Sequence, residues 1–587
     1  MRAFLTCFLA LGLAAVPALA GTSDKDATKE APAANTAEKA APATKPAEPA
    51  KPAAAAKPAA PPVEEQLQQL RNLIQAQTQE LEAQRAALRQ QQQKMDELAA
   101  QLKNSGTNHE IVSTAPGANA SGEPLAGTAA TGAAVGTATV STPAPANPQE
   151  VQPGEKSPLQ FRIGSAYITP VGFVDFTGVW RSKDGGSGIG TNFAGIPYGN
   201  VFSNNLSEFR FSMQNSRIGF RVDADVHGSH VIGYMESDFL GNNPGNVAVS
   251  SNSNTLRSRL YWVDLRKDQW EVLGGQTWSL ITPGRSGISP LPADIFYTQN
   301  MDVNYQLGLV WGRIPELRVV YHPTDKMAFA VALDSPEQYI GGSSGGSLIT
   351  LPAAFGAFAG TQLNNGASTL GVPNRGPDII AKVAFDPTKR IHIEGGGVER
   401  QFQLFNTVNG KHFSKVGGGG FINLNIEVVK GLRLVTNNFW SDGGGRYIFG
   451  QAPDLVVRAN GDISLVHSGS TVTGFEYTHG KTMLFGYYGG LYVSRDIAID
   501  TNGKPVGYGF NGAPSGQNRV VHEGTFGFNQ TFWKDAKYGA LNFIGQYSYL
   551  TRDPWFVATG QPKNALLNMV FVDLRYTLPG SAPTIGK

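Results

Sequence analysis

Residues 570–578 read VFVDLRYTL, and this stretch near the end of the chain determines the predicted fold class. Its even-numbered positions are apolar or aromatic, whereas its odd-numbered positions include Asp573 and Arg575. Because successive side chains of a strand point to opposite faces, this period of two predicts a half-buried β-strand. Similar segments recur throughout 161–578, and no sustained helical period interrupts them. We therefore predict an all-β region there.

Short polar turns and long Gly-, Asn-, Ser- or Pro-rich connections alternate along this region. Seven hairpin turns are expected, at 226–229, 266–269, 322–325, 386–389, 429–431, 479–481 and 533–537. Eight longer connections are expected near 181–205, 239–255, 279–305, 335–377, 404–414, 443–462, 495–518 and 552–566. Interleaving them requires sixteen antiparallel strands with both chain ends on the short-turn side. An even number of strands, with short turns at one end of the barrel and long loops at the other, is typical of a transmembrane outer-membrane β-barrel.

The alternation also assigns each side chain to the outer or the inner face of the barrel. Three apolar rows are expected to point outward: Ile218, Phe220, Val222, Ala224 and Val226; Ile422, Leu424, Ile426 and Val428; and Met483, Phe485, Tyr487 and Leu491. A soluble sandwich would bury such rows against a second sheet, so a soluble exported sandwich or solenoid is the alternative. Sixteen strands enclose a water-filled lumen, which predicts a pore.

The first 20 residues have the layout of a secretory signal peptide. A short positive start precedes an apolar run at 3–16 and a small-x-small cleavage site at 18–20. The alternative is a membrane anchor, for which the apolar run is too short to span comfortably. Cys7, the one cysteine of the chain, lies in this segment. The cleaved chain would therefore have no thiol, disulfide or thiolate metal site.

Three further segments precede the predicted barrel. Residues 21–62 are predicted to be a disordered Ala- and Pro-rich tether, and 104–160 a second low-complexity linker. Between them, 63–103 place apolar or Gln residues at an alternating 4-3 spacing over more than five heptads. This period predicts an α-helical coiled coil, with a trimer favoured although the heptads leave the strand number open. A solvated single helix is the alternative for residues 63–103. At the other end of the chain, residues 579–587 are predicted to be a C-terminal tail.

Charge and motifs argue against other classes of protein. The chain has 48 Lys and Arg against 46 Asp and Glu, which gives no general attraction to nucleic acid. The segment 341–345 (GGSSG) matches GxSxG but lies in a Gly/Ser-rich loop and not in a strand-to-helix turn. The segment 479–482 (HGKT) lacks the first Gly of a P-loop. We expect no catalytic residues, no enzyme activity, no cofactor and no metal.

The layout of signal peptide, Ala/Pro tether, Gln-rich heptads and barrel resembles the DcaP-like trimeric outer-membrane porins. Porin-like strand phrases occur at 171–175 (VGFVD), 216–220 (SRIGF), 261–265 (YWVDL) and 275–279 (GQTWS). The resemblance implies a sixteen-stranded homotrimer, a periplasmic coiled coil and passage of small anions such as dicarboxylates. One departure is the C-terminus, because many outer-membrane barrels end on an aromatic residue, whereas eleven residues follow Tyr576.

Residues that set selectivity are expected in one long loop and on the inner wall. The third long connection resembles, by its order, the loop that folds into the lumen of sixteen-strand porins, so Arg285, Asp294 and Asp302 are constriction candidates. The pore-lining basic candidates, from inward parity, are Arg217, Arg221, Arg259, Arg318, Arg433 and Arg575. Guanidinium groups suit carboxylates and phosphates. The alternative is that these arginines pair with Asp223, Asp225 or Asp573 and only solvate the wall.

These features together predict an outer-membrane porin for passive diffusion of small hydrophilic solutes, with its N-terminal region in the periplasm. Residues 1–150 hold 12 of the 48 basic and 14 of the 46 acidic side chains, which leaves 36 against 32 elsewhere and favours anions weakly. The expected partners are two further copies of the chain, outer-membrane lipid and lipopolysaccharide, small anionic solutes, and the peptidoglycan layer through the coil. The alternatives are a non-transporting structural or adhesive barrel and an outer-membrane hydrolase.

Overall fold

The computed structural model describes most of the chain from Ser157 to Gly580. The described ranges are 157–185, 188–241, 254–291, 295–299, 305–342, 348–358, 374–406, 409–448 and 451–580. The predicted signal peptide, tether and coiled coil, nearly all of the linker, and the last residues of the tail lie outside these ranges. Two constriction candidates, Asp294 and Asp302, lie outside them as well.

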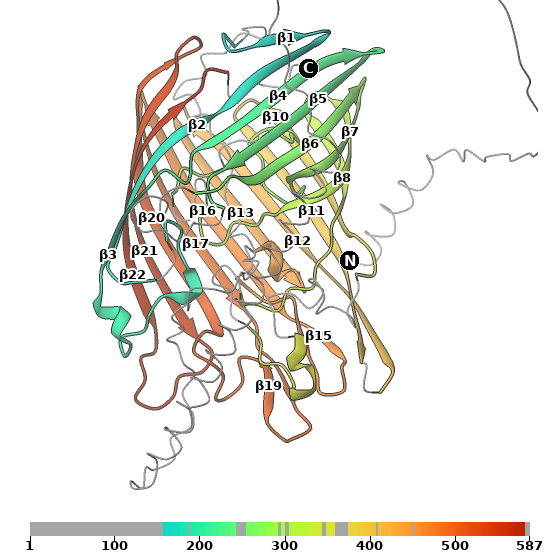
Figure 1. Cartoon of the computed structure of the whole chain (residues 1–587), viewed down its shortest axis with the longest axis vertical. Coiled ribbons are helices and arrows are strands. Elements are labelled where there is room, and N and C mark those ends of the chain that lie inside the picture. Colours follow the sequence, from blue (N-terminus) through green and yellow to red (C-terminus); the bar gives the residue numbers. More distant parts are fainter. Residues whose placement is uncertain are drawn as a thin grey trace, which may run out of the picture. The chain divides into compact units, whose positions relative to one another are not determined.

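An antiparallel sheet closes on itself to form a barrel (Figure 1). Its strands are β1 (Phe161–Ile163), β2 (Ala166–Arg181), β3 (Glu208–Ser212), β4 (Arg217–Val226), β5 (Ser229–Asp238), β6 (Arg257–Lys267), β7 (Trp270–Trp278), β8 (Arg313–Thr324), β9 (Met327–Asp334), β10 (Asp378–Thr388), β11 (Ile391–Asn406), β12 (Lys411–Val429), β13 (Leu432–Asp442), β16 (His467–His479), β17 (Thr482–Val493), β20 (Asn518–Asp535), β21 (Gly539–Pro554) and β22 (Ala565–Thr577).

Pairing of β2 with β22 closes the barrel, with register pairs from Phe173↔Thr577 to Arg181↔Met569. The other edge of β2 pairs with β4 over its first half and with β3 over its second half. Strands β3 and β4 therefore occupy one position in the wall, and β1 is a short extension that pairs with the start of β2. Counted this way, the described residues form the sixteen antiparallel strands that the sequence predicts.

The two ends of the barrel differ as expected, and we call them the turn end and the loop end. All seven predicted turns connect neighbouring strands at the turn end. The fifth predicted long connection, 404–414, is wrong, because β11 and β12 pair as far as Asn406↔Lys411 and leave only residues 407–410 between them. The strand alternation of β11 and β12 continues to the tip of their hairpin. The polar residues near this tip led to the prediction of a longer loop.

The outward rows of β4 and β12 are confirmed, since Ile218, Phe220 and Ile422 are exposed on the outer wall. The third row is wrong. Met483, Phe485, Tyr487 and Leu491 of β17 are buried inside the barrel, whereas Leu484, Tyr488 and Tyr492 point outward. A loop inside the barrel packs against this part of the wall, so β17 is apolar on both faces and its hydrophobicity does not reveal its parity.

The last strand, β22, has the alternating faces that its sequence predicts. Val570, Val572 and Leu574 of β22 are exposed on the outer wall, and Asp573 and Arg575 are buried inside. The strand ends at Thr577, which places the closing ladder before the C-terminal tail. Across the described ranges, no helix is both long and apolar enough to cross a bilayer.

Loops from the loop end fold into the barrel and form its apolar core. The contributing residues are the described ones of the first (182–207), third (279–312), fourth (335–377), sixth (443–466) and seventh (494–517) loops, with the small elements η1 (Phe193–Gly195), η3 (Ala353–Phe358), η5 (Gly445–Tyr447), β14 (Leu455–Val457), β15 (Ile463–Leu465) and β19 (Pro505–Tyr508). The elements η2 (Phe202–Asn205) and β18 (Asp496–Ile499) contribute no side chain to this core. Thr350 and Gly507 form a bridge that joins the fourth and seventh loops. The described loops therefore place packed apolar side chains inside the loop end of the barrel.

Candidate pore constriction

The third loop leaves the wall after β7, and its described residues, 279–291, 295–299 and 305–312, fold into the barrel. Its base is closed by the amide of Ser279, which donates to the carbonyl of Gly312 at 2.8 Å. Leu280 and Ile281 are fully buried just inside this base. The predicted insertion of this loop into the barrel is therefore confirmed for its described residues.

The first part of the third loop is anchored to β10 and β11. The amide of Gly284 donates to Glu394 Oε2 at 3.0 Å, and the amide of Gly287 donates to the Asp386 carboxylate at 2.8 Å. The Lys382 ammonium donates to the carbonyl of Thr282 at 2.8 Å. These are hydrogen bonds with one charged partner, which are stronger than neutral ones and fix the position of the loop.

Arg285 extends from this loop to the opposite part of the wall. Its two terminal nitrogens lie 2.8 and 2.6 Å from the carboxylate oxygens of Glu476 on β16. The guanidinium also lies 5.3 Å from the ring centre of Tyr297, and the Tyr487 hydroxyl donates to Glu476 at 2.8 Å. The constriction candidate Arg285 is therefore inside the barrel, but it shares its charge with a carboxylate.

The second described part of the loop, residues 305–311, is buried against β13, β17 and β20. The amide of Leu307 donates to Glu523 at 2.9 Å, and the amide of Val310 donates to Asn437 at 3.0 Å. Gly308 between them has φ +90°, and a Cβ there would lie 2.4 Å from the carbonyl oxygen of Thr471. Only glycine fits this approach of loop and wall.

Every basic wall candidate is ion-paired in the structure. The pairs are Arg217–Glu236 (3.6 Å), Arg221–Asp223 (2.6 Å), Arg259–Glu236 (2.8 Å), Arg259–Asp238 (2.6 Å), Arg318–Glu316, Arg433–Glu427 (3.9 Å), Arg575–Asp175 (2.8 Å) and Arg575–Asp573 (3.0 Å). Of the three expected acidic partners, Asp223 and Asp573 take this role, whereas Asp225 lies 2.9 Å from His230. Each candidate arginine therefore has a carboxylate partner, so none of the six presents an isolated positive charge.

A row of aromatic side chains that the sequence did not reveal crosses the interior. Its rings belong to Phe193 of the first loop, Tyr305 and Trp311 of the third loop, and Trp278 at the end of β7, and we call this row the aromatic bar. Neighbouring ring centres lie 5.5 Å apart for Phe193–Tyr305, 6.1 Å for Tyr305–Trp311 and 5.2 Å for Trp278–Trp311. Trp278 was part of a porin-like phrase, but nothing in the sequence indicates that the four residues meet.

Tyr447 of the sixth loop is a second site residue that the sequence did not reveal. Its hydroxyl donates to Asp378 at 2.9 Å, and its ring centre lies 5.5 Å from the Arg400 guanidinium and 5.3 Å from that of Arg446. Its carbonyl accepts a 2.9 Å hydrogen bond from the Trp311 amide. Burial and nearby carboxylates raise the pKa of Tyr447 well above its ordinary value, so the hydroxyl stays a donor.

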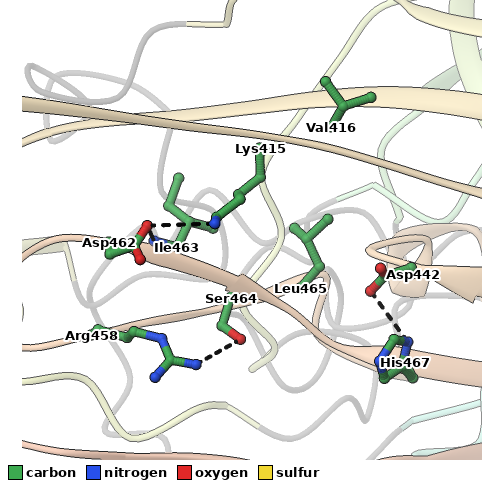
Figure 2. A pocket seen from close by; sticks show the side chains of 9 residues that line it. All are labelled: Lys415, Val416, Asp442, Arg458, Asp462, Ile463, Ser464, Leu465 and His467. Atoms are coloured by element: carbon green, nitrogen blue, oxygen red, sulfur yellow. Dashed lines mark hydrogen bonds and ion pairs between the residues drawn. The ribbon is translucent and has the colours of Figure 1, made fainter.

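A separate polar pocket of about 430 Å³ lies where β12 extends beyond the end of β13 (Figure 2). Figure 2 shows a lysine beside an aspartate, a histidine beside an aspartate, and an arginine beside a serine. Lys415 lies 4.0 Å from Asp462, and His467 lies 3.3 Å from Asp442. Arg458 donates to the Ser464 hydroxyl at 3.2 Å. This pocket therefore has mixed charge, and it shares no residue with the third loop.

No protein-family model and no curated protein sequence matches this chain. Among solved structures, the outer membrane channel DcaP of Acinetobacter baumannii matches 71% of this chain and 99% of its own, with a TM-score of 0.51 and 16% identity. An anion-selective porin from Comamonas acidovorans matches 70% of this chain and 99% of its own, with a TM-score of 0.39 and 14% identity. The likeness to DcaP that the sequence suggested is confirmed at the level of the fold: the described residues form a barrel similar to that of this outer membrane channel.

Proposed function

We propose that this protein is a porin of the bacterial outer membrane through which small hydrophilic solutes diffuse passively. The observation that carries this proposal is a closed sixteen-strand barrel with an apolar outer wall, a charged inner wall and one loop anchored across its interior. An apolar outer wall suits lipid, because a closed barrel leaves no unpaired strand edge in the membrane. Diffusion of this kind requires no enzyme activity and no cofactor.

The finer part of the proposal is a mild preference for anions, dicarboxylates included. It is supported by the excess of 36 basic over 32 acidic side chains after residue 150. The pairing of every wall candidate argues for a ratio of anion to cation permeability of only a few-fold, because paired charges attract a passing ion weakly. Two further parts of the proposal are assembly into a homotrimer and a periplasmic N-terminal region that contacts peptidoglycan, with lipopolysaccharide around the barrel.

Planar bilayer recording with the purified full-length chain tests the function. We expect discrete conductance steps, a small reversal potential of anionic sign in a KCl gradient, and measurable current carried by succinate or phthalate. Silent bilayers with binding to cell surfaces would instead indicate an adhesive barrel. Turnover of lipid or peptide substrates by the same preparation would indicate a hydrolase.

A further inference from the structure

The aromatic bar connects opposite sides of the barrel wall. At one end, Phe193 begins η1, which packs against β20 and β21. At the other end, Trp278 is the last residue of β7. Counted along the ladders of the described sheet, β7 and β20 lie seven positions apart in a barrel of sixteen, which places them nearly opposite each other. The bar therefore extends across the interior.

The bar is also dry. Phe193 and Tyr305 have no exposed surface, and Trp311 and Trp278 have 5% and 7%. Burial of aromatic rings against one another excludes water from the space between them, and a hydrated solute cannot cross a layer of packed rings. A solute that moves through this barrel must pass beside the bar, so the position of the bar limits the size of that solute.

Tyr447 fixes the position of Trp311 within the bar. The Trp311 amide donates to the Tyr447 carbonyl, and Trp311 and Ile448 form a parallel bridge. The sixth loop is thus joined to the third loop through main-chain atoms, and the Tyr447 side chain holds this junction.

The Tyr447 side chain is fixed from three directions. Its hydroxyl lies 2.9 Å from Asp378 on β10 and 3.4 Å from Asp334 on β9. The two arginines beside its ring are themselves anchored, since Arg400 lies 3.0 Å from Asp378 and Arg446 lies 3.3 Å from the same carboxylate. A rigid wall therefore holds the ring, and the ring holds the junction with Trp311.

We propose that Tyr447 is a positioning residue that holds Trp311 in the aromatic bar and thereby sets the size limit of the channel. This inference rests on the proposed porin function. According to this inference, the two loop residues Tyr447 and Trp311 set the size limit for solutes, and the charged residues of the inner wall do not.

Substitution of Tyr447 and Trp311 tests the inference in planar bilayers with full-length protein. We expect Tyr447→Ala and Trp311→Ala each to raise the unit conductance about two-fold or more and to admit larger polyethylene glycols. The double variant should match the single variants, because both changes remove the same obstruction, whereas independent effects would multiply. Tyr447→Phe keeps the ring between the arginines and should give a conductance between wild type and Tyr447→Ala.

The control is Tyr549→Ala, because this tyrosine is exposed on the outer wall and should leave conductance unchanged. Heat-dependent mobility on gels verifies that each barrel is folded. If Tyr447→Ala does not fold, Tyr447→Phe tests the positioning role, because it removes only the hydroxyl that contacts Asp378 and Asp334, and wild-type conductance in this variant would overturn that role. Wild-type conductance and polymer size limit in Trp311→Ala, or multiplied effects in the double variant, would overturn the inference. A wild-type protein that conducts no ions would instead overturn the proposed function.

Discussion

At the residue scale, parity along a strand reveals the face of a side chain but not its partner. Parity predicts an inward position for Arg217 and Arg575, and both are buried inside the barrel. Their partners Glu236 and Asp175 are on neighbouring strands, and the register that brings them together depends on hydrogen-bonded ladders that no local pattern encodes. For the same reason, the pairing of Arg285 with Glu476, 191 residues away, could not be predicted.

Replacing Arg285 with alanine tests whether this pair affects selectivity. The change leaves the Glu476 carboxylate without its guanidinium, so the interior gains one net negative charge and the preference for anions should fall. We expect the reversal potential in a KCl gradient to shift toward the cation-selective sign.

The matched variant is Glu476→Gln, which retains the side-chain volume and leaves Arg285 unneutralised. It should shift the reversal potential in the opposite direction. Identical reversal potentials in wild type and both variants would exclude a role of this pair in selectivity.

At the scale of elements, the spacing of turns predicted the barrel because each hairpin has a local signature of turn residues between alternating strands. The strand count needs only these signatures, and it is correct. The error at β17 has a different origin, since an apolar inner face exists only because the third loop packs there. The local sequence pattern of a strand carries no information about packing against an element that is distant in sequence.

Gly308→Ala tests how the third loop fits against the wall. A Cβ at this position would lie 2.4 Å from the Thr471 carbonyl oxygen, and alanine at φ +90° carries a further cost of about 1–3 kcal/mol. We expect the unfolding temperature to fall by several degrees and the open channel to become noisier, while the barrel still forms.

Gly512→Ala is the control, because its φ of +93° is similar but no atom lies within 4 Å of the added Cβ. Gly512→Ala therefore measures only the conformational cost of alanine at a positive φ, without a steric clash. Equal effects of the two substitutions on unfolding and noise would show that close contact with the wall does not determine the loop position.

At the scale of the whole molecule, the role of the barrel and the role of the N-terminal segments can be tested separately. The barrel is closed by the ladder between β2 and β22, and β2 begins at Ala166. The sequence predicts that 63–103 form a trimeric coiled coil, which would add strength to an assembly of barrels without contributing to the wall. Conduction and assembly should therefore depend on different parts of the chain.

A variant that lacks residues 21–150 but keeps the signal peptide tests this separation. We expect unit conductance and reversal potential to equal those of the full-length protein, because the residues that form the bar and the ion-paired wall are retained. The proposed trimers should dissociate at lower temperature or detergent concentration on native gels, since the predicted coil would no longer link three chains. A variant with the heptad leucines at 67, 81 and 88 changed to serine is the control, because it removes the coil without shortening the chain. Unchanged trimer stability in both variants would contradict a trimeric coil, and an altered unit conductance in the deletion alone would mean that the N-terminal segments contribute to the conducting path.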